Sequence, residues 1–211
     1  MSSREKILQK LRATDRPFVD VPEISRQRVV PDVDESPSGL IERFIAEAEK
    51  VKVNVYPVRN PAEGIEIALE LIGDEKQILS WAQDRIPLEG LHEALAHAGI
   101  GIAHPADGNI PVGITGANAG LAATGGLILY SGKGQYRTAS LLPDKHIVIL
   151  QGEQIVRDFE SWAESVRHDF NKPSNITVIT GPSKTADIAQ ELILGAHGPR
   201  SVHIILVWQH S

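Results

Sequence analysis

The sequence predicts a single-domain α/β protein with a mixed, mainly parallel sheet flanked by helices. Between residues 51 and 103, short β-branched runs alternate with helical patterns, which is typical of parallel strands joined by right-handed connections. Two glycine-rich segments follow, at 113–137 and 180–200. The 211 residues, of which 42% are apolar and 23% charged, suffice for one sizeable core.

The first 37 residues are expected to form a separate piece of the molecule. Ile7, Leu8 and Leu11 share one stripe of a helix over residues 3–12. Four prolines between residues 15 and 37 predict an extended arm that either frays or lies across a neighbour, and such an arm is a route to a homo-oligomer. We therefore divide the chain into a helix and arm, residues 1–37, and an α/β domain, residues 38–211.

The domain is expected to begin with a helix capped by Ser38, because apolar residues recur at helical spacing after it. A second helix starts at Asn60, with a first-turn proline and a returning Glu63, and ends at Gly73. The remaining elements expected in this half are strands at 51–56, 78–81 and 100–103 and a helix at 88–98.

The second half is expected to be richer in strands. Residues 112–130 predict two antiparallel strands that meet or bend near Thr124. The further elements expected are strands at 146–150, 176–180, 192–195 and 202–207 and helices at 154–168 and 185–190.

The composition excludes several classes of function. With no cysteine, the chain has no thiolate for iron–sulfur ligation, zinc binding or nucleophilic catalysis. A net charge of −6 argues against a non-specific nucleic-acid binder. No apolar run approaches the roughly 20 residues of a membrane helix, and no secretory signal is evident, so we expect no membrane insertion and a cytoplasmic location.

No metal site and no cofactor are predicted. His92 and His97 lie five residues apart on a predicted helix, about 140° around its axis, so they do not share a face. His146 and His203 fall in predicted strands and are expected to be core or edge residues. A Rossmann glycine pattern and a nucleophile-elbow motif are both absent.

The first glycine-rich segment predicts a ligand site. Glycines between Gly113 and Gly126 let the backbone approach a ligand and expose N–H donors. The alternative is that these glycines only relieve crowding where strands cross. The residues proposed here as ligand-binding are Thr115, Gly116, Asn118 and Thr124.

Two further segments predict a seat for a small anion. Residues 131–137 combine Gly132 and Gly134 with a lysine and Arg137, although a plain hairpin turn would look the same. Residues 180–187 follow a strand and precede a predicted helix, where free N–H groups favour an anion, although Ser183 or Thr185 could equally be a simple N-cap. The ligand-binding residues proposed in this second segment are Gly181, Ser183, Lys184 and Thr185.

Both turns are expected to converge on one pocket, together with Arg200. His197 is flanked by glycines and followed by this arginine, so it is the single histidine we propose for proton transfer.

Five motifs in order resemble the lactate-utilisation (LUD) domain family, in its LutC-like branch. These motifs are Gly113–Asn118, Thr124-Gly125, Leu142–His146, Thr180–Ile188 and Gly195–Pro199, and the resemblance covers roughly residues 38–207. It implies a fold like that of the sugar-phosphate isomerase and CoA-transferase (NagB/RpiA-like) superfamily. It also implies a role in the oxidation of L-lactate to pyruvate beside iron–sulfur subunits, which agrees with the absence of cysteine.

The resemblance leaves the chemical role of this chain open. The family pattern has an acidic residue where this chain has Ala123, which offers neither acid–base nor covalent chemistry. This difference favours ligand binding or complex assembly over catalysis by that route. The alternative is a free-standing enzyme or binding protein for a small anionic ligand of the sugar-phosphate or CoA type, because a fold alone does not fix a function.

Overall fold

The computed structural model describes residues 3–13, 34–166, 173–186, 192–194 and 198–208. The chain divides into two units, residues 1–31 and residues 32–211. The described part of the first unit is helix α1 (Ser3–Ala13), which confirms the expected N-terminal helix. The side chain of Ile7 in this helix is 59% exposed. Most of the expected arm, residues 14–33, lies outside the described residues.

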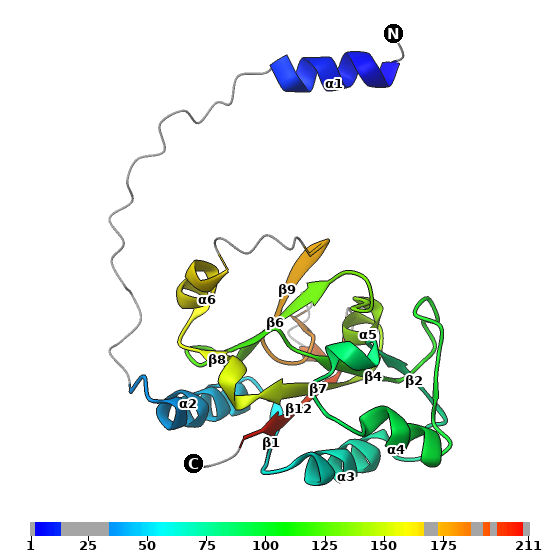
Figure 1. The fold of residues 1–211 in the computed structure, drawn as a ribbon, viewed down its shortest axis with the longest axis vertical. Coiled ribbons are helices and arrows are strands. Elements are labelled where there is room, and N and C mark those ends of the chain that lie inside the picture. The colour runs from blue at the N-terminus through cyan, green and yellow to red at the C-terminus, as the bar shows by residue number, and fades with distance from the viewer. Residues whose placement is uncertain (1–2, 14–33, 167–172, 187–191, 195–197, 209–211) are drawn as a thin grey trace. The chain divides into compact units, whose positions relative to one another are not determined.

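The second unit is built on a six-stranded sheet, here called the main sheet (Figure 1). Its strand order is β1-β12-β7-β4-β2-β3, and every neighbouring pair is parallel, as the sequence predicts. Its strands are β1 (Asn54–Val58), β2 (Gln77–Ser80), β3 (Gly101–Ile102), β4 (Val112–Gly116), β7 (Lys145–Gln151) and β12 (Ser201–Val207).

Helices cover one face of the main sheet, and helices together with a smaller sheet cover the other. Gly64, in α3 (Pro61–Ile72), packs against Ile205 of β12. On the opposite face, Gly120 approaches Leu150 of β7 and Phe44 of α2 (Pro37–Lys50). Figure 1 shows α3 and α4 (Leu91–His97) on one side, and α5 (Thr138–Leu141) with the smaller sheet on the other.

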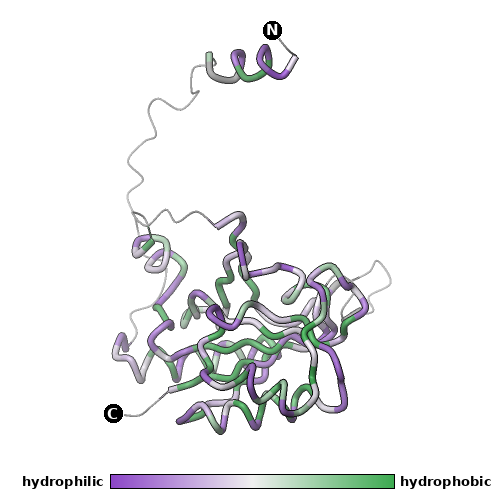
Figure 2. The backbone as a smooth tube through the Cα atoms, turned by 45° about the vertical axis from the view of Figure 1, so that its right-hand side comes forward, coloured by the Kyte–Doolittle hydropathy of each residue, from purple (hydrophilic) through white to green (hydrophobic). Residues whose placement is uncertain are grey.

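Burial on both faces accounts for the apolar sequences of the central strands. Ile147, Val148, Ile149 and Leu150 are each 0% exposed, because successive side chains enter the cores on opposite faces. In Figure 2 the hydrophobic segments accordingly concentrate along the strands of the second unit.

The N-caps of α3 and α2 can be compared with those expected from the sequence. Asn60 caps α3 as expected, because its side chain accepts a hydrogen bond from the N–H of Glu63, and Gly73 ends the helix at φ 66°. The predicted cap of α2 is wrong by two residues. Ser36, rather than Ser38, accepts the hydrogen bond from the N–H of Gly39, because Pro37 occupies the first helical position.

The smaller sheet has the order β8-β5-β6-β9. Its strands are β8 (Ile155–Val156), β5 (Ala119–Leu121), β6 (Gly126–Ser131) and β9 (Asn175–Ile179). Residues 112–130 thus form three strands instead of two. The first belongs to the main sheet, and the other two form the expected antiparallel pair.

Two of the predicted helices are wrong in part. Within the described residues 154–166, the α-helix is α6 (Phe159–Ser165), because Ile155 and Val156 extend to pair with Gly120 and Leu121. Residues 167 and 168 of the predicted helix lie outside the described residues. The predicted helix at 185–190 begins as a strand, since β10 (Lys184–Ala186) pairs with β11 (Leu192–Leu194). Residues 187–191 lie outside the described residues.

Candidate functional site

The parallel order of the main sheet brings the ends of several strands together at its carboxyl edge, where open α/β sheets bind ligands. The segment after β2 includes a short 3₁₀ helix, Gln83–Arg85. The turn at 132–135 reaches the same edge, since the N–H of Ala82 donates to the carbonyl oxygen of Gly134 at 2.8 Å. The indole N–H of the buried Trp81 donates to the carbonyl oxygen of Tyr136 at 3.2 Å. These contacts place the turn beside the loops after β2 and β4.

A hollow of about 210 Å³ lies between these segments, and we call it the polar hollow. Residues that line it include Asp84, Arg85, Ala117, Asn118, Gln135 and Gln154. They come from the loops after β2, β4 and β7 and from the turn at 132–135. The polar hollow therefore lies where β4 of the main sheet leads into β5 of the smaller sheet.

Gly116 and Asn118 shape this junction. A Cβ at Gly116 would lie 2.5 Å from the carbonyl oxygen of Arg85, so this glycine lets the loop after β2 approach β4 closely. Asn118 accepts a hydrogen bond from the N–H of Tyr130 at 2.8 Å through its side-chain oxygen, which leaves its NH₂ group for a ligand. The glycine thus relieves crowding at the same junction that forms the polar hollow, and a ligand-binding role for Gly116 and Asn118 stays a prediction.

Two glutamines that the sequence analysis missed hold this junction together, and one of them, Gln154, lines the hollow. Gln154 donates to the carbonyl oxygen of Ala117 at 2.7 Å and accepts from the N–H of Gln151 at 2.8 Å. Gln151 in turn donates to the carbonyl oxygen of Pro87. The available signal was a Gln-x-x-Gln spacing directly after an apolar strand, which resembles a capping box.

The charge of the polar hollow is small. Arg85 and Asp84 approach to 3.4 Å, and both side chains are at least half exposed, so this ion pair is weak. The arrangement supplies amide and guanidinium hydrogen-bond donors for a small polar molecule.

The glycines of the predicted anion seat at 131–137 form a tight turn. The N–H groups of Gly132 and Gln135 bond to each other's carbonyl oxygens at 3.1 Å, so neither is free for an anion. Gly134 takes a φ of 78°, which favours glycine. The side chain of Arg137 lines a different hollow, described below.

Thr115 lies inside the core instead of at the hollow. Its hydroxyl is 2.9 Å from Nε2 of His146, and both residues are 0% exposed. Burial lowers the pKa of His146 to about 3, with a smaller contribution from His203, so its ring is neutral at physiological pH. Burial also lowers the pKa of His203, which is half-buried beside Tyr56. Both histidines are core residues, as expected.

Gly181 and Ser183, in the second glycine-rich segment, lie at the amino edge of the main sheet. A Cβ at Gly181 would lie 2.5 Å from the carbonyl oxygen of Val51, which precedes β1. The N–H of Ser183 donates to the carbonyl oxygen of Pro199 at 2.8 Å, just before β12. The expectation that the two turns share a pocket is therefore wrong, because they occupy opposite edges of the sheet.

The other predicted residues of this group follow Ser183. Arg200 pairs with Asp144 at 3.3 Å, Lys184 is exposed in β10, and Thr185 lies in the same strand. The side chain of Thr124 is exposed, and its hydroxyl accepts a hydrogen bond from the N–H of Gly126. A binding role for these residues stays a prediction. His197 lies outside the described residues.

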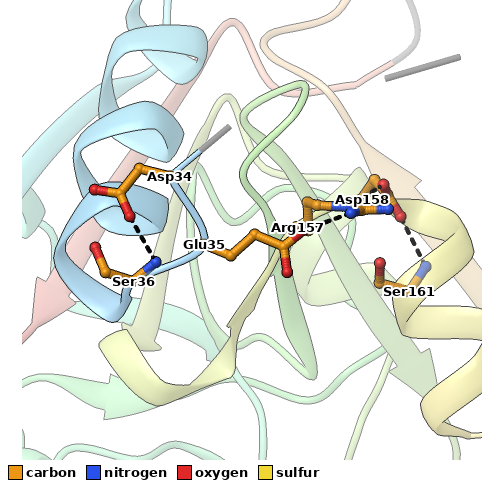
Figure 3. A network of polar contacts seen from close by, with 6 residues as sticks. All are labelled: Asp34, Glu35, Ser36, Arg157, Asp158 and Ser161. Carbon is orange, nitrogen blue, oxygen red and sulfur yellow. Dashed lines mark hydrogen bonds and ion pairs between the residues drawn. The ribbon is translucent and has the colours of Figure 1, made fainter. Parts of the chain in front are cut away.

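A polar network that the sequence did not reveal joins the start of the second unit to the loop before α6 (Figure 3). Arg157 bonds to Glu35 at 2.5 Å and to Asp158 at 2.9 Å. Burial acts to raise the pKa of Asp158, but hydrogen bonds from Ser161 and Arg157 outweigh it and hold this pKa below its ordinary value. The N–H of Ala123 donates to the carbonyl oxygen of Arg157 at 2.9 Å, while the guanidinium of Arg157 pairs with the carboxylates of Glu35 and Asp158.

In residues 3–13, 34–166, 173–186, 192–194 and 198–208, no three histidine, aspartate or glutamate side chains are grouped so as to hold a metal ion. No helix in this part of the chain combines the length and apolar character of a membrane span.

Comparison with known proteins gives a consistent result. The sequence model of the LUD domain matches residues 41–207. Lactate utilization protein C of Geobacillus sp. (strain WCH70) is 40% identical over 100 residues, which are 46% of this chain and 42% of that protein. The chain thus aligns with less than half the length of this relative.

Two longer alignments extend the comparison. The uncharacterized protein YkgG of Escherichia coli (strain K12) is 31% identical over 180 residues, which cover 77% of this chain and 78% of that protein. The crystal structure of a DUF162 family protein from Deinococcus radiodurans has a TM-score of 0.60 at 21% identity and covers 82% of this chain and 98% of its own. It shows the same fold.

Proposed function

Because this chain belongs to the LUD domain family, we propose that it is a LutC-like lactate utilisation protein. In this proposal it is a non-cluster subunit that supports the oxidation of L-lactate to pyruvate together with iron–sulfur partner proteins in the cytoplasm. The similarity to several proteins named lactate utilization protein C carries the proposal. The absence of cysteine supports the division of labour, since cluster ligation by thiolates must then come from other subunits.

In this role the polar hollow binds a small carboxylate of the size of lactate or pyruvate. The amide groups of Asn118 and Gln135 and the guanidinium of Arg85 are hydrogen-bond donors of the kind a carboxylate or hydroxyl accepts. Among the described residues, none that lines the hollow is a serine, a cysteine or a histidine. The hollow is therefore suited to binding and placing the ligand, and the electron transfer is assigned to the partners.

Growth and turnover measurements test the role. Deletion of the gene is expected to impair growth on L-lactate and to leave growth on pyruvate unchanged. The purified single chain is expected not to oxidise lactate with an artificial acceptor, whereas the complex with its iron–sulfur partners does. Robust lactate oxidation by the chain alone would instead support the free-standing enzyme.

The hollow has its own test within the complex. Asn118→Asp keeps the size and the acceptor for Tyr130 but replaces the NH₂ donor with a negative charge. We expect it to raise the KM for lactate about tenfold or more, since a charge-assisted contact is lost and repulsion is added. Asn175→Asp, on the exposed part of β9, is the matched control. An unchanged KM in Asn118→Asp would remove the hollow from the lactate site.

His197 remains the residue proposed for proton transfer. His197→Gln removes titration near neutral pH. A general acid–base role predicts a loss of about 10²–10⁴ in the turnover of the complex. Altered stability with near-normal turnover would assign His197 a structural role.

A further inference from the structure

A second and larger hollow, of about 500 Å³, lies beside the polar hollow and contributes nothing to the proposed lactate site. It is lined by His104, Pro105, Ala106, Tyr136, Arg137 and Thr138, and we call it the basic hollow. One wall is the loop after β3, and the other is the segment between the turn at 132–135 and α5. Its volume falls in the range of about 300–1,000 Å³ that is usual for sites of drug-sized ligands.

The lining side chains offer hydrogen-bond donors, and none of the described lining residues is acidic. Arg137 makes no ion pair with any residue in the described ranges. The hydroxyl of Thr138 is buried and has no partner among the described residues. The N–H of Ala106 donates to Nδ1 of His104 at 3.2 Å, so the neutral ring carries its proton on Nε2, which is then a donor.

The backbone that holds these side chains is fixed, although the side chains of His104, Tyr136 and Arg137 are exposed. The carbonyl oxygen of Tyr136 accepts from the buried Trp81, and that of Arg137 accepts from the N–H groups of Ser140 and Leu141. The N–H of Ala103 donates to the carbonyl oxygen of Ile78 and anchors the opposite wall. Such preorganisation lowers the entropic cost of binding.

Tyr136 adds a flat apolar surface to this set of donors. Tyr136 is 44% exposed. Pro105 and Ala106 supply further apolar surface across the hollow. An exposed aromatic ring next to a free guanidinium suits a ligand with a planar ring and an anionic group. Three donors from separate side chains suit a phosphate, which presents several oxygens, better than a single hydroxyl.

From these observations we infer that the basic hollow binds a phosphate ester carrying a planar ring, the chemical class of mononucleotides. The phosphate contacts Arg137, His104 and Thr138, and the ring stacks on Tyr136. This inference is independent of the role in lactate oxidation, because the two hollows have different lining residues.

Calorimetric titration of the full chain with AMP tests the inference. AMP is expected to bind at least about tenfold more tightly than adenosine or inorganic phosphate, because each of these probes lacks one group of contacts. L-Lactate is expected not to compete with AMP. Phosphate binding as tight as that of AMP would overturn the assignment of the ring, and absence of saturable AMP binding would overturn the site.

Variants assign the contacts. Arg137→Gln is expected to weaken AMP about tenfold or more and to leave adenosine unchanged, since a charge-assisted hydrogen bond is lost. Tyr136→Leu is expected to weaken AMP about fivefold or more and to leave ribose 5-phosphate unchanged. Lys133→Gln, in the same turn but outside the hollow, is the matched control and should bind AMP normally.

A blocking variant tests the site when several side chains share the binding energy, so that the loss of one contact changes the AMP affinity too little to measure. Ala106→Phe adds bulk inside the hollow at an exposed residue, and it should abolish AMP binding at an unchanged Tm. AMP binding that survives Ala106→Phe, or that is lost in Lys133→Gln alone, would place the ligand elsewhere.

Discussion

The main sheet and the smaller sheet bury their strands to different degrees. Each central strand of the main sheet has apolar neighbours on both faces, and β4 is buried along its whole length. In the smaller sheet, β9 is an edge strand, and Ile176 and Val178 are 45% and 46% exposed. Errors of packing should therefore be costly in the main sheet and tolerated at the edge of the smaller one.

The largest expected effect on the free energy of unfolding comes from replacing a glycine of the main sheet, compared with a glycine of the smaller sheet. In the main sheet, a Cβ at Gly113 would lie 1.9 Å from the carbonyl oxygen of Ala139, which is backbone and cannot rotate away. In the smaller sheet, a Cβ at Gly120 would meet only side-chain ends, at 3.0 to 3.2 Å. Urea unfolding should show a loss of about 3 kcal/mol or more for Gly113→Ala and a clearly smaller loss for Gly120→Ala. Equal losses would contradict the difference between the sheets.

The next effect is a pH dependence that comes from the main sheet. Because the pKa of His146 is about 3 in the folded protein and near 6.5 when unfolded, the unfolded state binds more protons between these values. Stability should therefore fall as the pH decreases from about 6.5 towards 3. Lowered pKa values of His92 and His203 act in the same direction.

His146→Gln isolates this contribution. It should reduce the proton uptake on unfolding, measured from the pH dependence of the free energy of unfolding, by up to one proton per molecule. If His146→Gln keeps the wild-type slope, His146 is not the neutral core residue described above.

A smaller effect is expected where α6 packs on the smaller sheet. Asp158 caps α6 through the N–H of Ser161 at 2.7 Å. Asp158→Ala should cost about 1 kcal/mol, whereas Asp158→Asn, which keeps a cap acceptor, should cost less. Thermal unfolding of both variants checks the order, and a greater loss in Asp158→Asn would contradict a capping role.

The smallest effect is expected at the edge of the smaller sheet. Ile176→Thr keeps β-branching on an exposed face and should change the free energy of unfolding by less than about 0.5 kcal/mol. The matched change Ile149→Thr, at a fully buried position of β7, should be strongly destabilising. Similar losses in the two variants would mean that the edge of β9 is covered.

The same contrast explains what the sequence could predict. The apolar run at 147–150 and the Asn60 cap of α3 can be recognised from neighbouring residues alone. Local patterns of this kind predict the alternating strands and helices of the main sheet. Ile155 shares helical spacing with Phe159 and Trp162, but only the latter two lie in α6. At Ile155 the pairing of β8 with β5 overrides the local pattern. Residues 184–186 are likewise decided by their antiparallel partner β11, which no local pattern indicates.

The candidate site was predicted in part for a similar reason. Asn118 and Arg137 were predicted as site residues and do line hollows. Each follows a strand whose carboxyl end the sequence pattern indicates. Gln135, Gln154 and His104 were missed because their role depends on which strands become neighbours. The amino-edge position of Gly181 and Ser183 depends on β9 joining the smaller sheet antiparallel to β6 instead of the main sheet.

The position of β12 has a consequence for synthesis on the ribosome. In the main sheet, β1 pairs only with β12, so Asn54 can pair with His203 only after β12 has been synthesised. Strand β12 also pairs with β7 on its other side. At a translation rate of about 5–20 residues per second, β1 is exposed without its neighbour for many seconds before the last strand emerges. Such non-local parallel pairing makes folding slow and leaves apolar edges open to other chains. Nascent chains that stop before residue 201 should therefore bind chaperones, and release should require the final strand.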